Sequence, residues 1–322
     1  MAPMKVYGWA VSPWIARALV CLEEAGVDYE IVPMSRCGGD HRRPEHLARN
    51  PFGEIPVLED GDLTLYQSRA IARYVLRKYK PELLRDGDLE GSALVDQWME
   101  VEAHHVEPTL WQIIRNCITG PYVGRPRDQA VVDENLAKLK KVLEVYEARL
   151  LGSKYLAGDD VTAADLCHFG FMRYFMATEY AGVVDAYPHV KAWWDALLAR
   201  PSVQKVMAGM PPDFGYASGN IPSCINLPYA SVNESLAKLK KVLEVYEARL
   251  LGSKYLAGDD VTAADLCHFG FMRYFMATEY AGVVDAYPHV KAWWDALLAR
   301  PSVQKVMAGM PPDFGYASGN IP

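Results

Sequence analysis

The hydrophobic pattern of the first eighty residues alternates between short apolar runs and helical spacings. The apolar runs predict four strands, at residues 4–7, 29–32, 55–58 and 63–66. Helical spacings begin near Pro13 and Ser68, and the acidic and glycine residues at 59–62 predict a hairpin turn. Strands that alternate with helices predict an α/β domain, which we assign to residues 1–80.

From about residue 89 onward the apolar period is that of helices. One long helix is predicted at 90–118, and a second carries an apolar stripe that starts at Leu136. Thr162 followed by Asp165 is a capping-box pattern, and it predicts the start of a third helix that is apolar on most sides and therefore buried. We assign residues 90–222 to an all-α domain.

One segment of the chain occurs twice. Residues 136–222 and 236–322, here the first and second copy, are identical at an offset of 100 positions. Residues 223–233 resemble neither copy and are interpreted as a linker, which leaves 234–322 as a partial duplicate of the helical domain. Because the duplicate lacks a counterpart of the helix at 90–118, we expect its apolar stripe to have no partner of its own.

Three outcomes are open for the second copy: it can compete with the first copy, pair with another chain, or stay partly unfolded. The first copy is connected directly to the rest of the domain, so its docking adds no loop-closure cost. We therefore predict that residues 1–222 fold normally and that the second copy docks loosely. Limited proteolysis should release a stable fragment that ends near residue 222, and its absence would contradict the prediction.

Composition and net charge argue against nucleic acid and membranes as partners of this protein. Apolar residues make up 51% of the 322 residues and charged residues 23%, which is typical of soluble globular proteins. The net charge of −7 gives no general attraction to nucleic acid, and no apolar run approaches the roughly 20 residues that span a bilayer. We expect neither a nucleic-acid nor a membrane partner, and the start of the chain lacks the apolar core of a secretory signal.

The cysteines and histidines do not form recognisable redox or metal motifs. Six cysteines without a CxxC pair predict free thiols in a reducing compartment, hence the cytoplasm. His104 and His105 are adjacent on a predicted helix and point about 100° apart, so no metal site is expected there. The cysteines are Cys21, Cys37, Cys117, Cys167, Cys224 and Cys267.

Ser12 is the candidate catalytic residue. Ser followed by Pro13 is a strong helix start, and one interpretation is that Ser12 only caps the helix. The other is that its hydroxyl donates a hydrogen bond to a thiolate, which the helix N-terminus also favours. Lowering a thiol pKa by about two units needs roughly 2.7 kcal/mol, which one charge-assisted hydrogen bond and a helix end can supply.

Three segments of the chain are distinctive, namely MAPMKVYG from Met1, HRR from His41, and NPFGEIPVLEDGDLTLYQSRAI from Asn50. Together they resemble the plant phi-class glutathione transferases, and the resemblance extends to about residue 210. It implies a thioredoxin-like N-terminal domain, an all-α C-terminal domain and a homodimer. It also implies conjugation of the glutathione thiolate to hydrophobic electrophiles in detoxification, with glutathione as co-substrate, no metal, and glutathione-dependent peroxide reduction as a further activity.

The resemblance also implies a set of site residues. For glutathione these are His41 and Arg42 at the glycyl carboxylate, Glu54 beside them, Ile55 and cis Pro56 at the cysteinyl part, and Gln67 and Ser68 at the γ-glutamyl end. For the electrophile pocket they are Val11, Trp14, Arg115 and Thr119. The family usually has Glu where this chain has Gln67, so we expect weaker glutathione affinity with retained activity.

Three other functions or outcomes are compatible with parts of the sequence. Glutaredoxin-like thiol transfer needs a cysteine at the start of the first helix, and this chain has Ser12 there. A non-catalytic carrier of hydrophobic ligands, and a duplicated product of impaired folding, are the two alternatives that the sequence leaves open.

Overall fold

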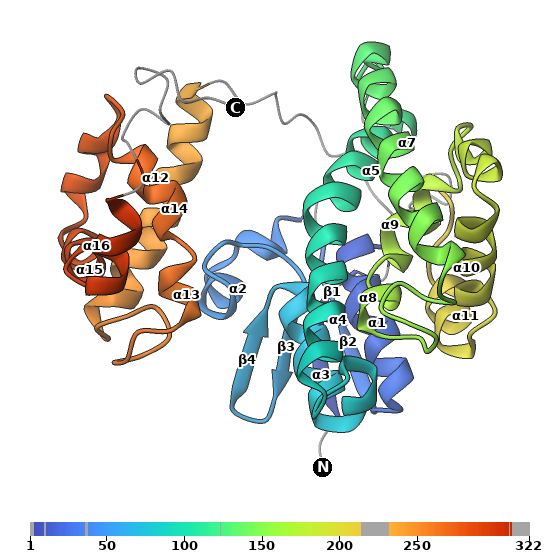
Figure 1. The fold of residues 1–322 in the computed structure, drawn as a ribbon, viewed down its shortest axis with the longest axis horizontal. Coiled ribbons are helices and arrows are strands. Elements are labelled where there is room, and N and C mark those ends of the chain that lie inside the picture. Colours follow the sequence, from blue (N-terminus) through green and yellow to red (C-terminus); the bar gives the residue numbers. More distant parts are fainter. Residues whose placement is uncertain are drawn as a thin grey trace. The chain divides into compact units, whose positions relative to one another are not determined.

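The chain divides into two compact units, Met1–Leu227 and Pro228–Pro322 (Figure 1). The computed structural model describes residues 3–9, 11–35, 38–122, 124–213, 232–308 and 310. Cys37, Cys224 and residues 223–231 of the predicted linker lie outside the described residues. The last two linker positions belong to a helix that begins at Val232.

The first unit begins with a four-stranded sheet in the order β2-β1-β3-β4. β1 runs parallel to β2 and antiparallel to β3, and β3 and β4 form the predicted hairpin. Val6 and Leu58, at the centre of the sheet, are fully buried. The strands are β1 Met4–Gly8, β2 Tyr29–Pro33, β3 Val57–Asp60 and β4 Leu63–Tyr66.

Helices α1 and α3 pack side by side and share one core with the sheet. The predicted strands and the helices from Pro13 and Ser68 are confirmed, except that β3 begins at Val57 and not at Ile55. Pro56 has no N–H for a strand ladder, which accounts for the later start. The helices are α1 Pro13–Ala25, the short helix η1 Asp40–Arg42, α2 Pro44–Arg49, α3 Ser68–Tyr79 and the short helix η2 Pro81–Leu84. The helices η1 and α2, between β2 and β3, were not predicted.

The long helix predicted at 90–118 is a succession of helical segments from Leu89 to Tyr122 that includes two π-helical turns. The first π turn contains Glu102, which is fully buried. π turns inside helices are rare and are frequent at functional sites. The segments are α4 Leu89–Val101, η3 Glu102–Val106, α5 Glu107–Ile114, η4 Arg115–Thr119 and α6 Gly120–Tyr122.

The remaining helices of the first unit pack against this succession. The capping box of Thr162 and Asp165 is confirmed, and the Trp193 indole N–H also donates to Asp165, at 2.9 Å. The buried helix predicted after Thr162 is in fact two short helices, separated by a turn at Cys167 and His168. The elements are α7 Gln129–Leu151, α8 Ala163–Leu166, α9 Phe169–Phe175, η5 Ala181–Ala186, α10 Pro188–Leu198 and α11 Pro201–Ala208.

The second unit repeats α7–α11 as α12–α16 and has a core of its own. The expectation that its apolar stripe lacks a partner is wrong in part: α12 packs against α15, and Leu243 on α12 is buried. Leu239 and Tyr246 on the same stripe are only half-buried, whereas Leu139 and Tyr146 in the first copy are buried. The first copy pairs α7 with α10 as the second pairs α12 with α15. The elements are α12 Val232–Leu251, α13 Ala263–Leu266, α14 Phe269–Phe275, η6 Ala281–Ala286, α15 Pro288–Leu298 and α16 Pro301–Met307.

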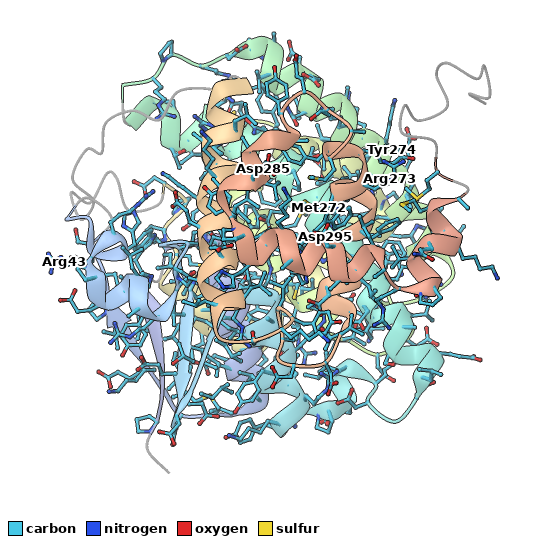
Figure 2. All side chains as sticks on the ribbon, turned by 90° about the vertical axis from the view of Figure 1, so that its left-hand side faces the viewer. Arg43, Met272, Arg273, Tyr274, Asp285 and Asp295 are labelled. Atoms are coloured by element: carbon cyan, nitrogen blue, oxygen red, sulfur yellow. The ribbon has the colours of Figure 1, made fainter. Side chains whose placement is uncertain are left out.

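The apolar residues that are buried in the first copy and exposed in the second lie mainly on α13 and α14, and Val306 on α16 is a further one, 54% exposed where Val206 is 6% exposed. Leu266 is 42% exposed and Phe271 is 88% exposed, whereas Leu166 and Phe171 in the first copy are fully buried. Met272, Arg273 and Tyr274 follow Phe271 along α14 (Figure 2). We call this surface the α13–α14 face, and its residues are Ala263, Ala264, Leu266, Cys267 and Phe271.

Phe271→Ser should reduce binding of an apolar dye and self-association of the protein while changing the free energy of unfolding by less than about 0.5 kcal/mol. The reason is that Phe271 is 88% exposed and contributes little to the core of the second unit. Dye fluorescence, light scattering and thermal unfolding measure the three quantities. Leu297→Ser, at a fully buried position of the same unit, is the contrasting variant and should destabilise that unit by at least about 2 kcal/mol.

Candidate functional site

Ser12 lies at the first turn of α1, but its hydroxyl does not cap the helix. The backbone of Ser12 is extended, its carbonyl accepts from the Ala16 N–H at 2.9 Å, and its side chain makes no capping bond. The Ser12 side chain is buried and its Oγ has no hydrogen-bond partner among the described residues. Because an unsatisfied buried polar group costs about 1–3 kcal/mol, this hydroxyl is suited to a group that binds at the helix end.

The loop that leads to Ser12 lies against the loop that contains His41. The Trp9 ring meets the His41 ring edge to face, with centroids 6.4 Å apart. A side chain at Gly53 would come within 2.9 Å of the His41 carbonyl oxygen, so residues 41 and 53 are in close contact. Burial raises the pKa of Glu54, and the nearby positive charge of Arg42 opposes that rise. Three of the predicted glutathione residues therefore cluster, and sequence reasoning missed Trp9.

The segment around Ile55 is fixed from both sides. The Ile55–Pro56 peptide bond is cis, as the resemblance implied. A side chain at Gly8 would lie 3.3 Å from the Ile55 Cδ1 atom, so the end of β1 approaches Ile55 closely. The Glu54 carbonyl lies 2.9 Å from His46 Nε2 and accepts from the Asn50 side-chain amide, also at 2.9 Å. The backbone before the cis bond is held in one position.

The junction between β4 and α3 carries Gln67 and Ser68. Gln67 has φ 73° and ψ 110°, a region that non-glycine residues rarely adopt. Such strained residues persist only where the surrounding structure holds them, often at ligand sites. Ser68 is the first residue of α3, and its Oγ accepts a hydrogen bond from Arg17 Nη1 at 2.8 Å.

A buried ion network supports this junction. Arg17, fully buried on α1, contacts Glu102 at 2.7 Å and Glu107 at 2.8 Å, and Arg69 pairs with both carboxylates. Burial alone would lower the pKa of Arg17, but the two carboxylates outweigh it and the pKa is raised. Burial opposes the charge of Glu107 too, yet Arg17 and Arg69 hold its pKa below the ordinary value. The network was missed from the sequence, although a charged residue inside the apolar helix 13–25 was a signal.

The structure divides the predicted pocket residues between two settings. Trp14 donates its indole N–H to Glu107 at 2.9 Å and packs edge to face on Trp111, with centroids 5.0 Å apart. The Val11 carbonyl accepts from the Tyr174 hydroxyl at 2.6 Å. Arg115 and Thr119 lie in the second π turn, beyond α5. Trp14 and Glu107 thus tie α1 to α5, and a pocket shared with Arg115 and Thr119 stays a prediction.

The cysteines in the described ranges are all free thiols, namely Cys21, Cys117, Cys167 and Cys267. Within the same ranges no cluster of three or more His, Cys, Asp or Glu side chains could hold a metal ion. The described helices include none that is both long and apolar enough to cross a membrane.

Family models match the chain in three places. The model described as "Glutathione S-transferase, N-terminal domain" matches residues 2–77. The model described as "Glutathione S-transferase, C-terminal domain" matches residues 108–201 and again residues 221–301. The second match to the same model falls on the second copy, in agreement with the repeat.

Several known proteins match about two thirds of the chain over nearly their own whole length. "Glutathione S-transferase 4" of Zea mays is 65% identical over 208 residues, which is 65% of this chain and 93% of that protein. "Probable glutathione S-transferase GSTF2" of Oryza sativa subsp. japonica is 57% identical over 213 residues, 66% of this chain and 99% of that protein. The solved structure of glutathione S-transferase I from maize in complex with an atrazine glutathione conjugate has a TM-score of 0.64 and 57% identity, and the match covers 66% of this chain and 99% of that one.

Proposed function

The chain belongs to the glutathione S-transferase family, and we propose that Ser12 is the residue that stabilises the glutathione thiolate for attack on hydrophobic electrophiles. The observation that carries the role of Ser12 is its buried hydroxyl, which neither caps α1 nor has another partner among the described residues. The thioredoxin-like domain followed by a helical domain is the fold of this family.

The chemistry follows from the position of Ser12 at a helix N-terminus. The free N–H groups and the dipole of α1 favour an anion there, and the Ser12 hydroxyl donates a hydrogen bond to it. Both effects lower the pKa of the glutathione thiol, so a larger fraction is thiolate at neutral pH. The thiolate sulfur then forms a bond to an electrophilic carbon; with an aromatic halide, the leaving halide departs with its bonding electron pair.

The other predicted residues hold the tripeptide. His41 and Arg42 would bind the glycyl carboxylate, with Glu54 beside them, and the backbone of Ile55 before cis Pro56 would bind the cysteinyl part. Gln67 and Ser68 would bind the γ-glutamyl end. The hydrogen bond of 2.8 Å from Arg17 to Ser68 Oγ supports this, because it orients the Ser68 hydroxyl and makes Arg17 a positioning residue.

The electrophile is proposed to be a hydrophobic xenobiotic, with Val11, Trp14, Arg115 and Thr119 lining its pocket. The maize relative that is 57% identical has been solved with an atrazine glutathione conjugate, which supports an aromatic substrate class. Reduction of organic hydroperoxides by the same thiolate, a cytoplasmic location and a homodimer complete the proposal. Turnover of glutathione with an aromatic halide tests it, and binding of glutathione without turnover would favour the carrier function.

Gln67→Glu should lower the KM for glutathione about three- to tenfold, with kcat changed less than twofold. The added carboxylate would face the γ-glutamyl ammonium group, and a charge-assisted hydrogen bond is worth about 1 kcal/mol more than a neutral one. Initial rates at varied glutathione and saturating electrophile measure the change. Gln112→Glu, on α5, is a control for the added charge. An unchanged or higher KM in Gln67→Glu would show that residue 67 does not face the ammonium group.

A further inference from the structure

The residues of the α13–α14 face recur in the first copy, on α8 and α9, where other helices of the first unit cover them. In the first copy, α8 and α9 pack on α1, with α4 and α5 alongside. A side chain at Gly170 would come within 2.2 Å of the Pro13 carbonyl oxygen, so the two backbones are in contact there. The Phe171 ring lies edge to face on the Trp14 ring, with centroids 5.1 Å apart.

Further contacts of the first copy with α1 are polar. Arg17 Nε donates to the Cys167 carbonyl at 3.2 Å, and Arg200 donates to both carboxylate oxygens of Glu24 at 2.6 Å. All the residues on the copy side of these contacts recur at an offset of 100 positions. In the second copy Gly270 meets nothing within 4 Å, and Arg300 Nε, which is buried, has no partner in the part of the chain that the structure describes.

The second copy already has the conformation of the docked first copy. The Tyr246 hydroxyl lies 2.8 Å from His268 Nε2, as Tyr146 does from His168 in the first copy. Trp293 donates to Asp265 at 2.9 Å, as Trp193 does to Asp165. Docking of the second copy would therefore require no internal rearrangement of these contacts.

We propose that the second copy can replace the first copy on α1, α4 and α5, so that the chain has two alternative ways to complete one transferase fold. The α13–α14 face is then a binding surface for the N-terminal half of this same chain. The fully buried Val132, which precedes the repeat, recurs as Val232 and can be replaced in the exchange. The exposed ion pair of Arg127 with Glu179 is not kept, because residue 227 is Leu. Asn135, which recurs as Ser235, is the buried position that changes.

Loop length decides which arrangement dominates. In the exchanged arrangement the connection from α6 to the docked copy is longer by the repeat offset of 100 residues. Loop closure scales with the 3/2 power of length, which disfavours the exchange by a factor on the order of 100. A substitution that weakens the docking of the first copy by more than about 100-fold should therefore cause the second copy to dock in its place.

The test uses the two matched glycines. Gly170→Leu places a side chain against the Pro13 backbone, whereas Gly270→Leu meets open space. In the full chain we expect Gly170→Leu to keep glutathione-conjugating activity within about tenfold of the natural chain, and Gly270→Leu to be unchanged. Gly170→Leu/Gly270→Leu should lose activity and the cooperative thermal unfolding of the first unit. Loss in Gly170→Leu as severe as in the double variant would overturn the proposal.

The rate of cysteine alkylation measures whether the second copy has docked, and it does not depend on enzymatic activity. Cys167 is fully buried in the docked copy and Cys267 is exposed. The peptides that contain Cys167 and Cys267 are identical in sequence, so the experiment uses a Cys167→Ser chain, in which Cys267 is the only cysteine of the two copies. Iodoacetamide should label Cys267 rapidly in this chain. Adding Gly170→Leu should slow that labelling at least tenfold, because Cys267 would then be buried on α1. If Cys267 stays as reactive as before, the second copy has not docked and the proposal is wrong, even where both leucine variants remain active.

Discussion

Ser12→Ala should lower kcat/KM for conjugation at pH 7 by about 100-fold. Removal of one preorganised donor to a reacting anion typically costs 10²–10³ in rate. Without the donor the pKa of the bound thiol rises toward the ordinary value of about 8.5, so the deficit should shrink as the pH approaches 9. A pH–rate profile of both forms with an aromatic halide measures the shift.

The free energy of unfolding of Ser12→Ala is the control for this prediction. Because Ser12 Oγ is buried without a partner among the described residues, its removal should leave the free energy of unfolding unchanged or slightly higher. Ser92→Ala, whose hydroxyl bonds to the Leu89 carbonyl on α4, should change neither activity nor pH profile. A Ser12→Ala enzyme with full activity at pH 7 would remove Ser12 from the catalytic role.

Arg17→Met should destabilise the first unit by about 3–5 kcal/mol, because it leaves the fully buried Glu102 and the half-buried Glu107 with one cation. The folded-state pKa of Glu107 lies below the unfolded value, so its stabilising contribution is present above about pH 4.3 and is lost as the pH falls through the folded pKa. Arg17→Met should reduce this acid-dependent part of stability. Urea unfolding from pH 7 down to about pH 2 measures both effects, because the loss lies between the unfolded pKa of Glu107 and its lower folded pKa.

Arg127→Met is the matched control for the loss of a positive charge. Arg127 pairs with Glu179 on an exposed surface, and exposed pairs contribute at most about 1 kcal/mol. Arg17→Met should also raise the KM for glutathione, since Arg17 orients Ser68. If the destabilisation matched that of Arg127→Met, the network would be of no importance for stability.

The local sequence pattern predicted the four strands and two of the helices of the N-terminal domain, but not α2 or η1. The four strands, the helix starts at Pro13 and Ser68 and the hairpin at 59–62 depend on residues that are neighbours in the chain. The Thr162–Asp165 capping box was predictable for the same reason. The predicted residues of the glutathione site came from a family resemblance that continuous segments carry, so that prediction needed no knowledge of long-range contacts.

Contacts between distant residues were not predictable in this way. Arg17 lies 85 residues from Glu102 and 90 residues from Glu107, and no local spacing links them. The pairing of Glu102 with Arg17 and the absence of a capping bond from the Ser12 hydroxyl are likewise features of the tertiary structure. From the sequence, capping alone and thiolate binding were both acceptable interpretations of Ser12.

The repeat separates the effect of the local sequence from the effect of tertiary contacts within one molecule. Because the sequences are identical, α7–α11 and α12–α16 form the same helices and the same internal hydrogen bonds, which the local sequence determined. Burial is a different matter: Phe171 is fully buried and Phe271 is 88% exposed. Only the tertiary structure decided this difference, because an apolar side chain leaves water only where another surface covers it, and within the first unit α1, α4 and α5 provide that surface.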